Sequence, residues 1–210
     1  MKKRKLSVKK IVKFVIVLLI IVALIIVAIK FLTKEDTVKK VEVEDEIKEY
    51  GYKMDDNETE YYKSLFKELK TVLEKETVDE NEYASLVSQL FLADFLNLDN
   101  KLSKNDVGGV QFIYTDFQSD FEKIAKEGIY DAVVNKETDA ESETEMPEVT
   151  NVEVVDLEHI THNYLDQTDN DAIQVDLKIT YKTDLDYQDT TSLILVHNGK
   201  KLEIVEMSED

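Results

Sequence analysis

Ser64 and Lys67 have the spacing of a nucleophile and the residue that activates it. They lie in the segment Ser64-Leu65-Phe66-Lys67, which matches the pattern S-x-x-K. In this pattern a lysine one helical turn away from the serine can help to activate the hydroxyl group. The companion motifs S-D-N and K-T-G do not occur in the sequence. An envelope hydrolase built on these two residues is therefore the most distant of three hypotheses for function.

Three histidines and one acidic turn are the candidate metal ligands. His159 and His162 lie three residues apart in a segment with the composition of a strand, where an odd offset places side chains on opposite faces. His197 falls in another expected strand. The turn Asp166–Asp171 offers carboxylates but lacks the glycine that calcium loops carry at the sixth position. We therefore expect no metal, no cofactor and no catalytic residue, with a weak cation site at this turn as the alternative.

The segment Asn97–Gly109 has an unusual composition for a connection between helices. It contains two adjacent glycines together with three asparagines and two aspartates. These residue types support positive φ angles and turns in which side chains bond to the backbone. We predict that this segment is a partner-binding loop. Its candidate binding residues are Asp99, Asn100, Lys101, Asn105, Asp106, Gly108 and Gly109.

Composition excludes several classes of function. The chain has no cysteine, which excludes disulfides, thiol catalysis, thiolate metal sites and a cysteine-linked lipid anchor. Residues 35–210 hold 17 basic groups and all 45 acidic groups of the chain. A surface of this charge repels phosphate backbones, so we expect no nucleic acid among the partners.

Helical periodicity dominates the first half of the soluble part. Apolar residues recur at spacings of three and four, which predicts three amphipathic helices. The first two begin at side-chain caps that a glutamate three positions later completes. The expected features are a cap at Asn57 with Glu60, a cap at Asp79 with Glu82, and a third helix over Val110–Tyr130 with a kink or cap near Gly128.

After Pro147 the apolar period changes from about 3.6 to 2, which predicts strands. Asn198-Gly199 is the strongest short signal for a hairpin between the last two strands. Short connections between successive strands favour an antiparallel meander, and its apolar face needs the three helices as cover. The fold class is therefore α+β, with strands at 149–161, 171–182, 190–198 and 200–207.

An apolar run at residues 11–32 is the expected membrane anchor. At 1.5 Å per residue it is about 33 Å long, which matches the hydrocarbon core of a bilayer. Basic residues crowd the positions before it and acidic ones follow it, so the N-terminus should be cytoplasmic. The sequence AIKFLTKED offers no small-residue cleavage site, which favours an uncleaved signal-anchor. Representative residues of this span are Ile11, Phe14, Leu18, Leu19, Leu24, Ile29 and Leu32.

These predictions divide the chain into a tail, an anchor, a linker and one extracytoplasmic domain. The protein should then be a single-pass protein of the cell membrane whose bulk lies outside. The expected ranges are a cytoplasmic tail at 1–10, the anchor at 11–32, a juxtamembrane linker at 33–56, and an α+β domain at 57–210 with a helical part at 57–134, an acidic linker at 135–148 and the sheet at 149–207.

Helices followed by a curled antiparallel sheet on one anchor resemble the cystatin-like, nuclear-transport-factor-like superfold. In its membrane-anchored form the architecture over about residues 57–207 is similar to exported domains of type IV secretion and conjugation assembly subunits, and to Firmicute surface proteins. The resemblance implies a scaffolding or docking domain more often than an enzyme.

The leading hypothesis for function is a binding or assembly module with a protein partner in the envelope. The second hypothesis is a protein with a pocket for a small molecule or peptide between sheet and helices.

Overall fold

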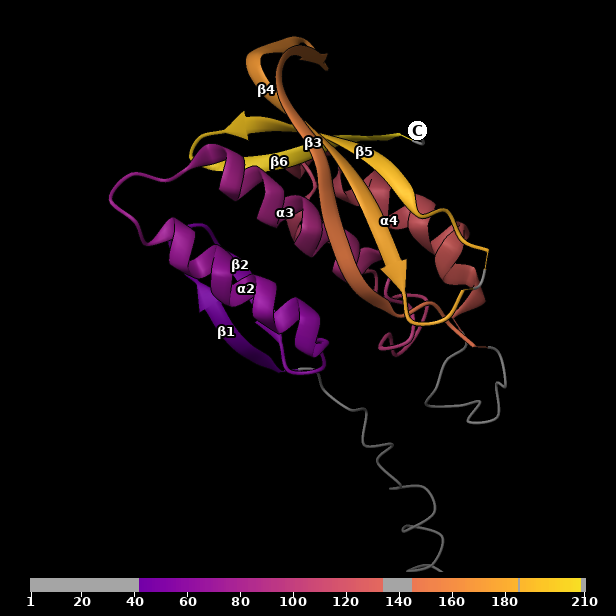
Figure 1. The fold of residues 1–210 in the computed structure, drawn as a ribbon. Coiled ribbons are helices and arrows are strands. Elements are labelled where there is room, and N and C mark those ends of the chain that lie inside the picture. The colour runs from indigo at the N-terminus through magenta and orange to yellow at the C-terminus, as the bar shows by residue number, and fades with distance from the viewer. Residues whose placement is uncertain (1–41, 134–144, 185, 209–210) are drawn as a thin grey trace, which may run out of the picture. The chain divides into compact units, whose positions relative to one another are not determined.

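The computed structural model describes residues 42–133, 145–184 and 186–208, which belong to one compact unit over Val41–Asp210 (Figure 1). It has the predicted α+β class, with three helices and a four-stranded antiparallel sheet. The expected anchor at 11–32, the tail before it and residues 134–144 of the acidic linker lie outside the described residues. Within the described ranges, no helix is both long and apolar enough to cross a membrane.

The four predicted strands form a meander in the order β3-β4-β5-β6. The hairpin signal at Asn198-Gly199 is confirmed, because Asn198 pairs with Lys201 and Gly199 takes a φ of 66°. The first two strands are longer than predicted and continue to a tight turn at Leu165, while shifts in their register bend the pair (Figure 1). The strands are β3 (Val149–Tyr164), β4 (Gln167–Tyr181), β5 (Thr190–Asn198) and β6 (Lys201–Ser208).

Helices α2 (Glu60–Leu73) and α3 (Glu80–Phe95) pack side by side, and α3 also packs on the sheet (Figure 1). The predicted cap of α3 is confirmed, since the Asp79 side chain accepts bonds from the N–H groups of Asn81 and Glu82. Eleven of the 16 residues of α3 are buried, so this helix is enclosed on most sides and not only along one stripe.

The predicted cap of α2 at Asn57 is wrong, because Thr59 caps the helix. Its hydroxyl oxygen accepts a hydrogen bond from the N–H of Tyr62 at 3.1 Å. Threonine and asparagine both satisfy a free N–H at a helix start. Only the residue directly before the first helical turn has the geometry to do so.

The predicted third helix over Val110–Tyr130 is broken into four pieces. Its regular part, α4, is short and begins only at Gln118. The segment bends at Ile113 and Tyr114, because Ile113 is extended and bridges Ile204 of β6, and the N–H of Tyr114 donates to the carbonyl oxygen of Ile204. The pieces are η1 (Val110–Phe112), η2 (Thr115–Phe117), α4 (Gln118–Glu127) and η3 (Ile129–Ala132).

A hairpin replaces the last part of the predicted linker at 33–56. Strands β1 (Val43–Ile47) and β2 (Tyr52–Asp55) pair in antiparallel fashion and turn at Gly51, whose φ is 70°. Tyr52 is buried against Tyr83 of α3, and their hydroxyl oxygens lie 2.6 Å apart. These residues therefore belong to the core of the domain.

Candidate functional site

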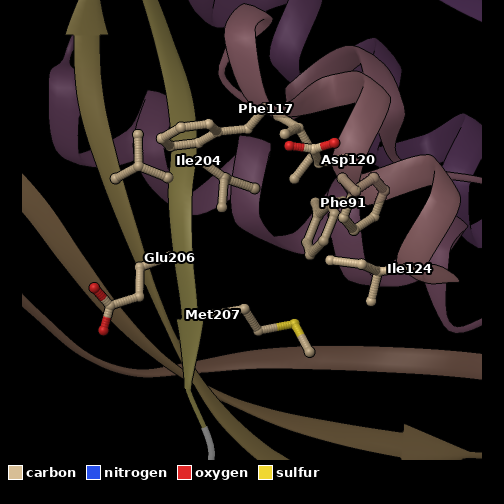
Figure 2. A pocket seen from close by; sticks show the side chains of 10 residues that line it. Phe91, Phe117, Asp120, Ile124, Ile204, Glu206 and Met207 are labelled. Atoms are coloured by element: carbon tan, nitrogen blue, oxygen red, sulfur yellow. The ribbon is translucent and has the colours of Figure 1, made fainter. Parts of the chain in front are cut away.

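An open apolar groove lies between α4 and the outer strand β6 (Figure 2). Its volume is about 280 Å³. Figure 2 shows Phe91 and Ile124 on the helical side and Met207 on the side of β6. The ten lining residues come from α3, the broken helical segment and β6: Phe91, Ile113, Phe117, Asp120, Phe121, Ile124, Ile204, Val205, Glu206 and Met207.

Two large apolar side chains at the rim of this groove are open to solvent. Ile124 is 71 % exposed and Met207 is 48 % exposed. In α4, Phe121 and Ala125 turn toward the core, so Ile124 extends the apolar stripe beyond the width that the core covers. Single exposed apolar residues are ordinary, but two that face one groove with an aromatic floor mark a binding surface.

The buried Glu203 fixes the start of the α4 segment against β6. One carboxylate oxygen accepts the N–H of Thr115 at 3.3 Å and the amide N–H of Asn198 at 2.7 Å. The other oxygen lies 3.3 Å from Nζ of Lys201. A buried carboxylate is stable only with such donors and a compensating cation. Glu203 therefore ties the segment that precedes α4 to β6.

Gly109 allows the floor of the groove to form. This residue has a φ of 77°, and an added Cβ would lie 2.7 Å from Cδ2 of Phe91. Glycine is required for both reasons, because other residues strain at this φ and cannot approach the ring so closely. Phe91 then stacks on Phe95 and tilts against Phe121. Gly109 thus allows the packing of the aromatic rings below the groove.

A buried ion pair organises the predicted partner-binding loop at Asn97–Gly109. Lys101 is only 2 % exposed, and its Nζ donates to Oδ1 of Asp94 on α3. Oδ2 of Asp94 accepts the N–H of Gly109 at 2.6 Å. An added Cβ on Gly108 would overlap with Asp94. The N–H of Gly108 donates to the hydroxyl of Tyr130 at 2.9 Å. The loop is therefore tied to α3 along its length.

The surroundings of this ion pair shift the pKa values of neighbouring groups. Burial, reinforced by the charge of Asp94, raises the pKa of Glu58 to about 8. Burial also raises the pKa of Asp55. Burial alone would lower the pKa of Lys101, but the charges of Asp94 and Glu58 outweigh it and raise that pKa. Lys101 thus stays charged, and burial favours the protonated form of Glu58.

The seven candidate residues of the loop differ in their accessibility. Lys101, Gly108 and Gly109 are buried. Lys101 pairs with Asp94, and both glycines lie against Asp94. Asn100 is half-buried and donates from its amide to the carbonyl oxygen of Asn57 at 3.2 Å. The remaining candidates lie nearer the surface: Asp106 accepts the N–H of Leu102, and Asp99 and Asn105 are exposed. Partner binding by this loop stays a prediction, although the packing explains its buried residues without a partner.

The structure does not bring Ser64 and Lys67 together. The hydroxyl of Ser64 donates to the carbonyl oxygen of Tyr61 in its own helix at 2.8 Å. Both residues are exposed on the outer side of α2, and no described hydrogen bond joins them. Among the described residues, no hydrogen bond joins the Ser64 hydroxyl to a side chain that could accept its proton. The spacing therefore does not form a nucleophile and base.

The histidines have carboxylate partners that periodicity alone could not reveal. Nδ1 of His159 lies 2.8 Å from Oδ1 of Asp171, and Nδ1 of His197 lies 2.9 Å from Oδ2 of Asp169. His162 Nε2 lies 3.7 Å from Glu206. Within the described ranges, no group of three or more His, Asp or Glu side chains is placed to hold a metal ion.

Sequence reasoning missed the groove because its walls are far apart in the chain. Phe117, Phe121 and Ile124 lie in the third predicted helix, where periodicity indicates apolar residues but does not show that Ile124 stays exposed beside the buried Ala125. The place of β6 as the last strand of a meander was the available signal.

Fold and groove define an α+β domain with helices against an antiparallel meander and an open apolar groove at the edge of the sheet. Comparisons of the chain with protein-family models, with curated proteins and with solved structures found no match. The groove is the feature from which function has to be argued.

Proposed function

We propose that this protein is a binding or assembly module of the cell envelope, held at the membrane by residues 11–32, and that it binds its partner in the groove between α4 and β6. The observation that carries this proposal is the pair of exposed apolar side chains, Ile124 and Met207, at the rim of an aromatic-floored groove. Surfaces of this kind are characteristic of interaction sites. The apolar run and charge asymmetry of the N-terminus support the location.

A pocket for a small apolar molecule is the second candidate function. A volume of about 280 Å³ is near the lower end of ligand sites, and the lining is mainly aromatic and aliphatic. The groove is open along β6, however, and offers only two polar side chains, Asp120 and Glu206. An open shape suits a segment of a partner protein better than an enclosed small molecule.

Site-specific photo-crosslinking in intact cells tests the proposed function. A photoreactive amino acid replaces Ile124 in one variant, and Val155 of β3 in a control variant. Val155 is 65 % exposed, so its accessibility is similar, but it does not line the groove. We expect a discrete adduct from position 124 and none from position 155.

Reconstitution with the purified partner then decides whether the adduct reflects specific binding. The captured protein should bind the purified chain, and Ile124→Asp should lower its affinity by about tenfold or more, since a charge replaces an apolar contact. Val155→Asp should leave the affinity unchanged. Equal adducts from both positions, or equal effects of both aspartates, would refute the groove as the binding site.

A further inference from the structure

Within the described ranges, the outer edge of β6 is unpaired beyond Ile204, where the groove begins. Strand β6 is the last strand of the sheet. On its outer side, the described residues contribute one short parallel bridge, between Ile113 and Ile204, with the N–H of Tyr114 donating to the carbonyl oxygen of Ile204 at 2.9 Å. After Tyr114 the chain turns into η2. The edge therefore already accepts an extended segment at Ile204, and no described strand continues this pairing along Val205–Ser208.

The groove lies along this same edge. Val205, Glu206 and Met207 of β6 line one side of it, and Phe117 and Ile124 line the other. In Figure 2, Met207 points toward Ile124, whereas the carboxylate of Glu206 points to the opposite side of the strand. A further strand paired with β6 would present its side chains alternately to opposite faces of the sheet. Every second side chain would then enter the apolar groove against α4. This geometry selects an extended peptide with apolar residues at alternate positions.

The charge around the groove selects the residues that flank such a peptide. Among the described residues, the two polar side chains that line the groove, Asp120 on α4 and Glu206 on β6, are both acidic, and no described lysine or arginine lines it. Glu206 also faces Nε2 of His162 at 3.7 Å. Lysine or arginine residues at the ends of the peptide would complement both carboxylates, whereas acidic ends would be repelled.

We propose that the groove binds an extended segment of a partner protein as an added strand beside β6, with alternate apolar side chains in the groove and basic residues opposite Asp120 and Glu206. The inference rests on the proposed function and specifies its partner. Backbone pairing along Val205–Ser208 supplies part of the affinity, and the apolar and basic side chains supply specificity.

Three synthetic peptides test this inference on the full chain in nanodiscs of a zwitterionic lipid. The first alternates leucine with threonine and has two lysines at each end. The second has glutamates in place of the lysines. The third keeps the sequence of the first but carries N-methyl groups on alternate backbone amides, which removes the donors that strand pairing needs. Binding is measured by fluorescence anisotropy, with empty nanodiscs as the background.

The lysine-flanked peptide should bind at least about tenfold more tightly than either of the other two. Asp120→Lys combined with Glu206→Lys should reverse the preference between lysine and glutamate ends. Glu127→Lys is the matched control, because Glu127 is exposed on the same helix and does not line the groove, and it should leave the preference unchanged.

Equal binding of the N-methylated peptide would overturn the added strand, and an unchanged preference in the double-lysine variant would overturn the role of the two carboxylates. If no peptide binds but crosslinking from position 124 still captures a partner that depends on Ile124, the inference fails while the proposed function stands. If the captured partner does not depend on Ile124 either, both the inference and the proposed function fail.

Discussion

The buried ion pair between Lys101 and Asp94 organises the loop Asn97–Gly109. Lys101 is only 2 % exposed and donates to the carboxylate of Asp94. The same carboxylate accepts the N–H of Gly109. A buried charge without its partner keeps its full desolvation penalty. The stability of the loop should therefore depend on Lys101 far more than on the exposed lysine that follows it at position 104.

Lys101→Met should lower the free energy of unfolding by about 3–5 kcal/mol, because Asp94 then remains buried without a cation. The measurement is urea unfolding of the purified chain. Lys104→Met is the matched control, since Lys104 forms an exposed pair with Asp131 at 3.4 Å, and it should change the free energy by less than about 1 kcal/mol. Equal effects of the two substitutions would contradict the account.

Glu58 should make the stability of the domain depend on pH. Its pKa rises from 4.5 to about 8 on folding, through burial and the nearby charge of Asp94. Between these values the folded state holds a proton that the unfolded state has released, so stability falls as pH rises through this window. Glu58→Gln removes the effect.

The Glu58→Gln variant should be more stable than the parent chain by about 1–3 kcal/mol at about pH 8.5, and the two should converge near pH 5. Urea midpoints at both pH values provide the measurement. The gain is expected because glutamine does not ionise, so no charge forms in the half-buried site at high pH. A variant that is less stable than the parent chain at both pH values would contradict the assigned pKa.

At the scale of elements, the start of α2 distinguishes the structure from the sequence prediction. Thr59→Ala should lower the free energy of unfolding by about 1 kcal/mol, because the N–H of Tyr62 loses its acceptor. Asn57→Ala should have little effect, since the bond at Asn57 uses its backbone carbonyl oxygen. Urea unfolding of both variants measures the difference, and a larger loss from Asn57→Ala would restore the original prediction.

Elements with a strong local period were predictable, and elements defined by distant partners were not. The meander, the cap at Asp79 and the hairpin turn at Gly199 follow from alternation and turn chemistry that a short window contains. The hairpin β1–β2 was missed because its charged residues face solvent and only Ile47, Tyr52 and Met54 are buried. Its apolar partners lie far away in the chain, so no local pattern reveals them.

The groove was only weakly indicated by the sequence, for the same reason. The cap of α2 was predicted at Asn57, two residues before Thr59, and this is an error of local geometry. The groove instead requires β6 to be the outer strand and the third helical segment to break at Ile113, so that α4 stands beside the free edge. Both depend on tertiary contacts such as the bonds of Glu203.

At the scale of the whole molecule, the proposed anchor at residues 11–32 predicts that the acidic domain lies outside the cell and the N-terminus inside. The chain has no cysteine, so single cysteines can report this topology. Ser64→Cys, on the exposed side of α2, should react with a membrane-impermeant maleimide in intact cells. Ser7→Cys, in the expected cytoplasmic tail, should react only after permeabilisation. The opposite pattern would show that the domain lies inside the cell.

The most direct test of the groove as the binding site is hydrogen exchange of the purified chain with and without the partner captured from position 124. Binding along the edge of β6 should slow exchange of the amides in Val205–Ser208 and in α4 by about tenfold or more, and should leave β3 unchanged. Unchanged exchange in β6, with protection at the loop Asn97–Gly109 instead, would contradict the account and favour that loop as the binding surface.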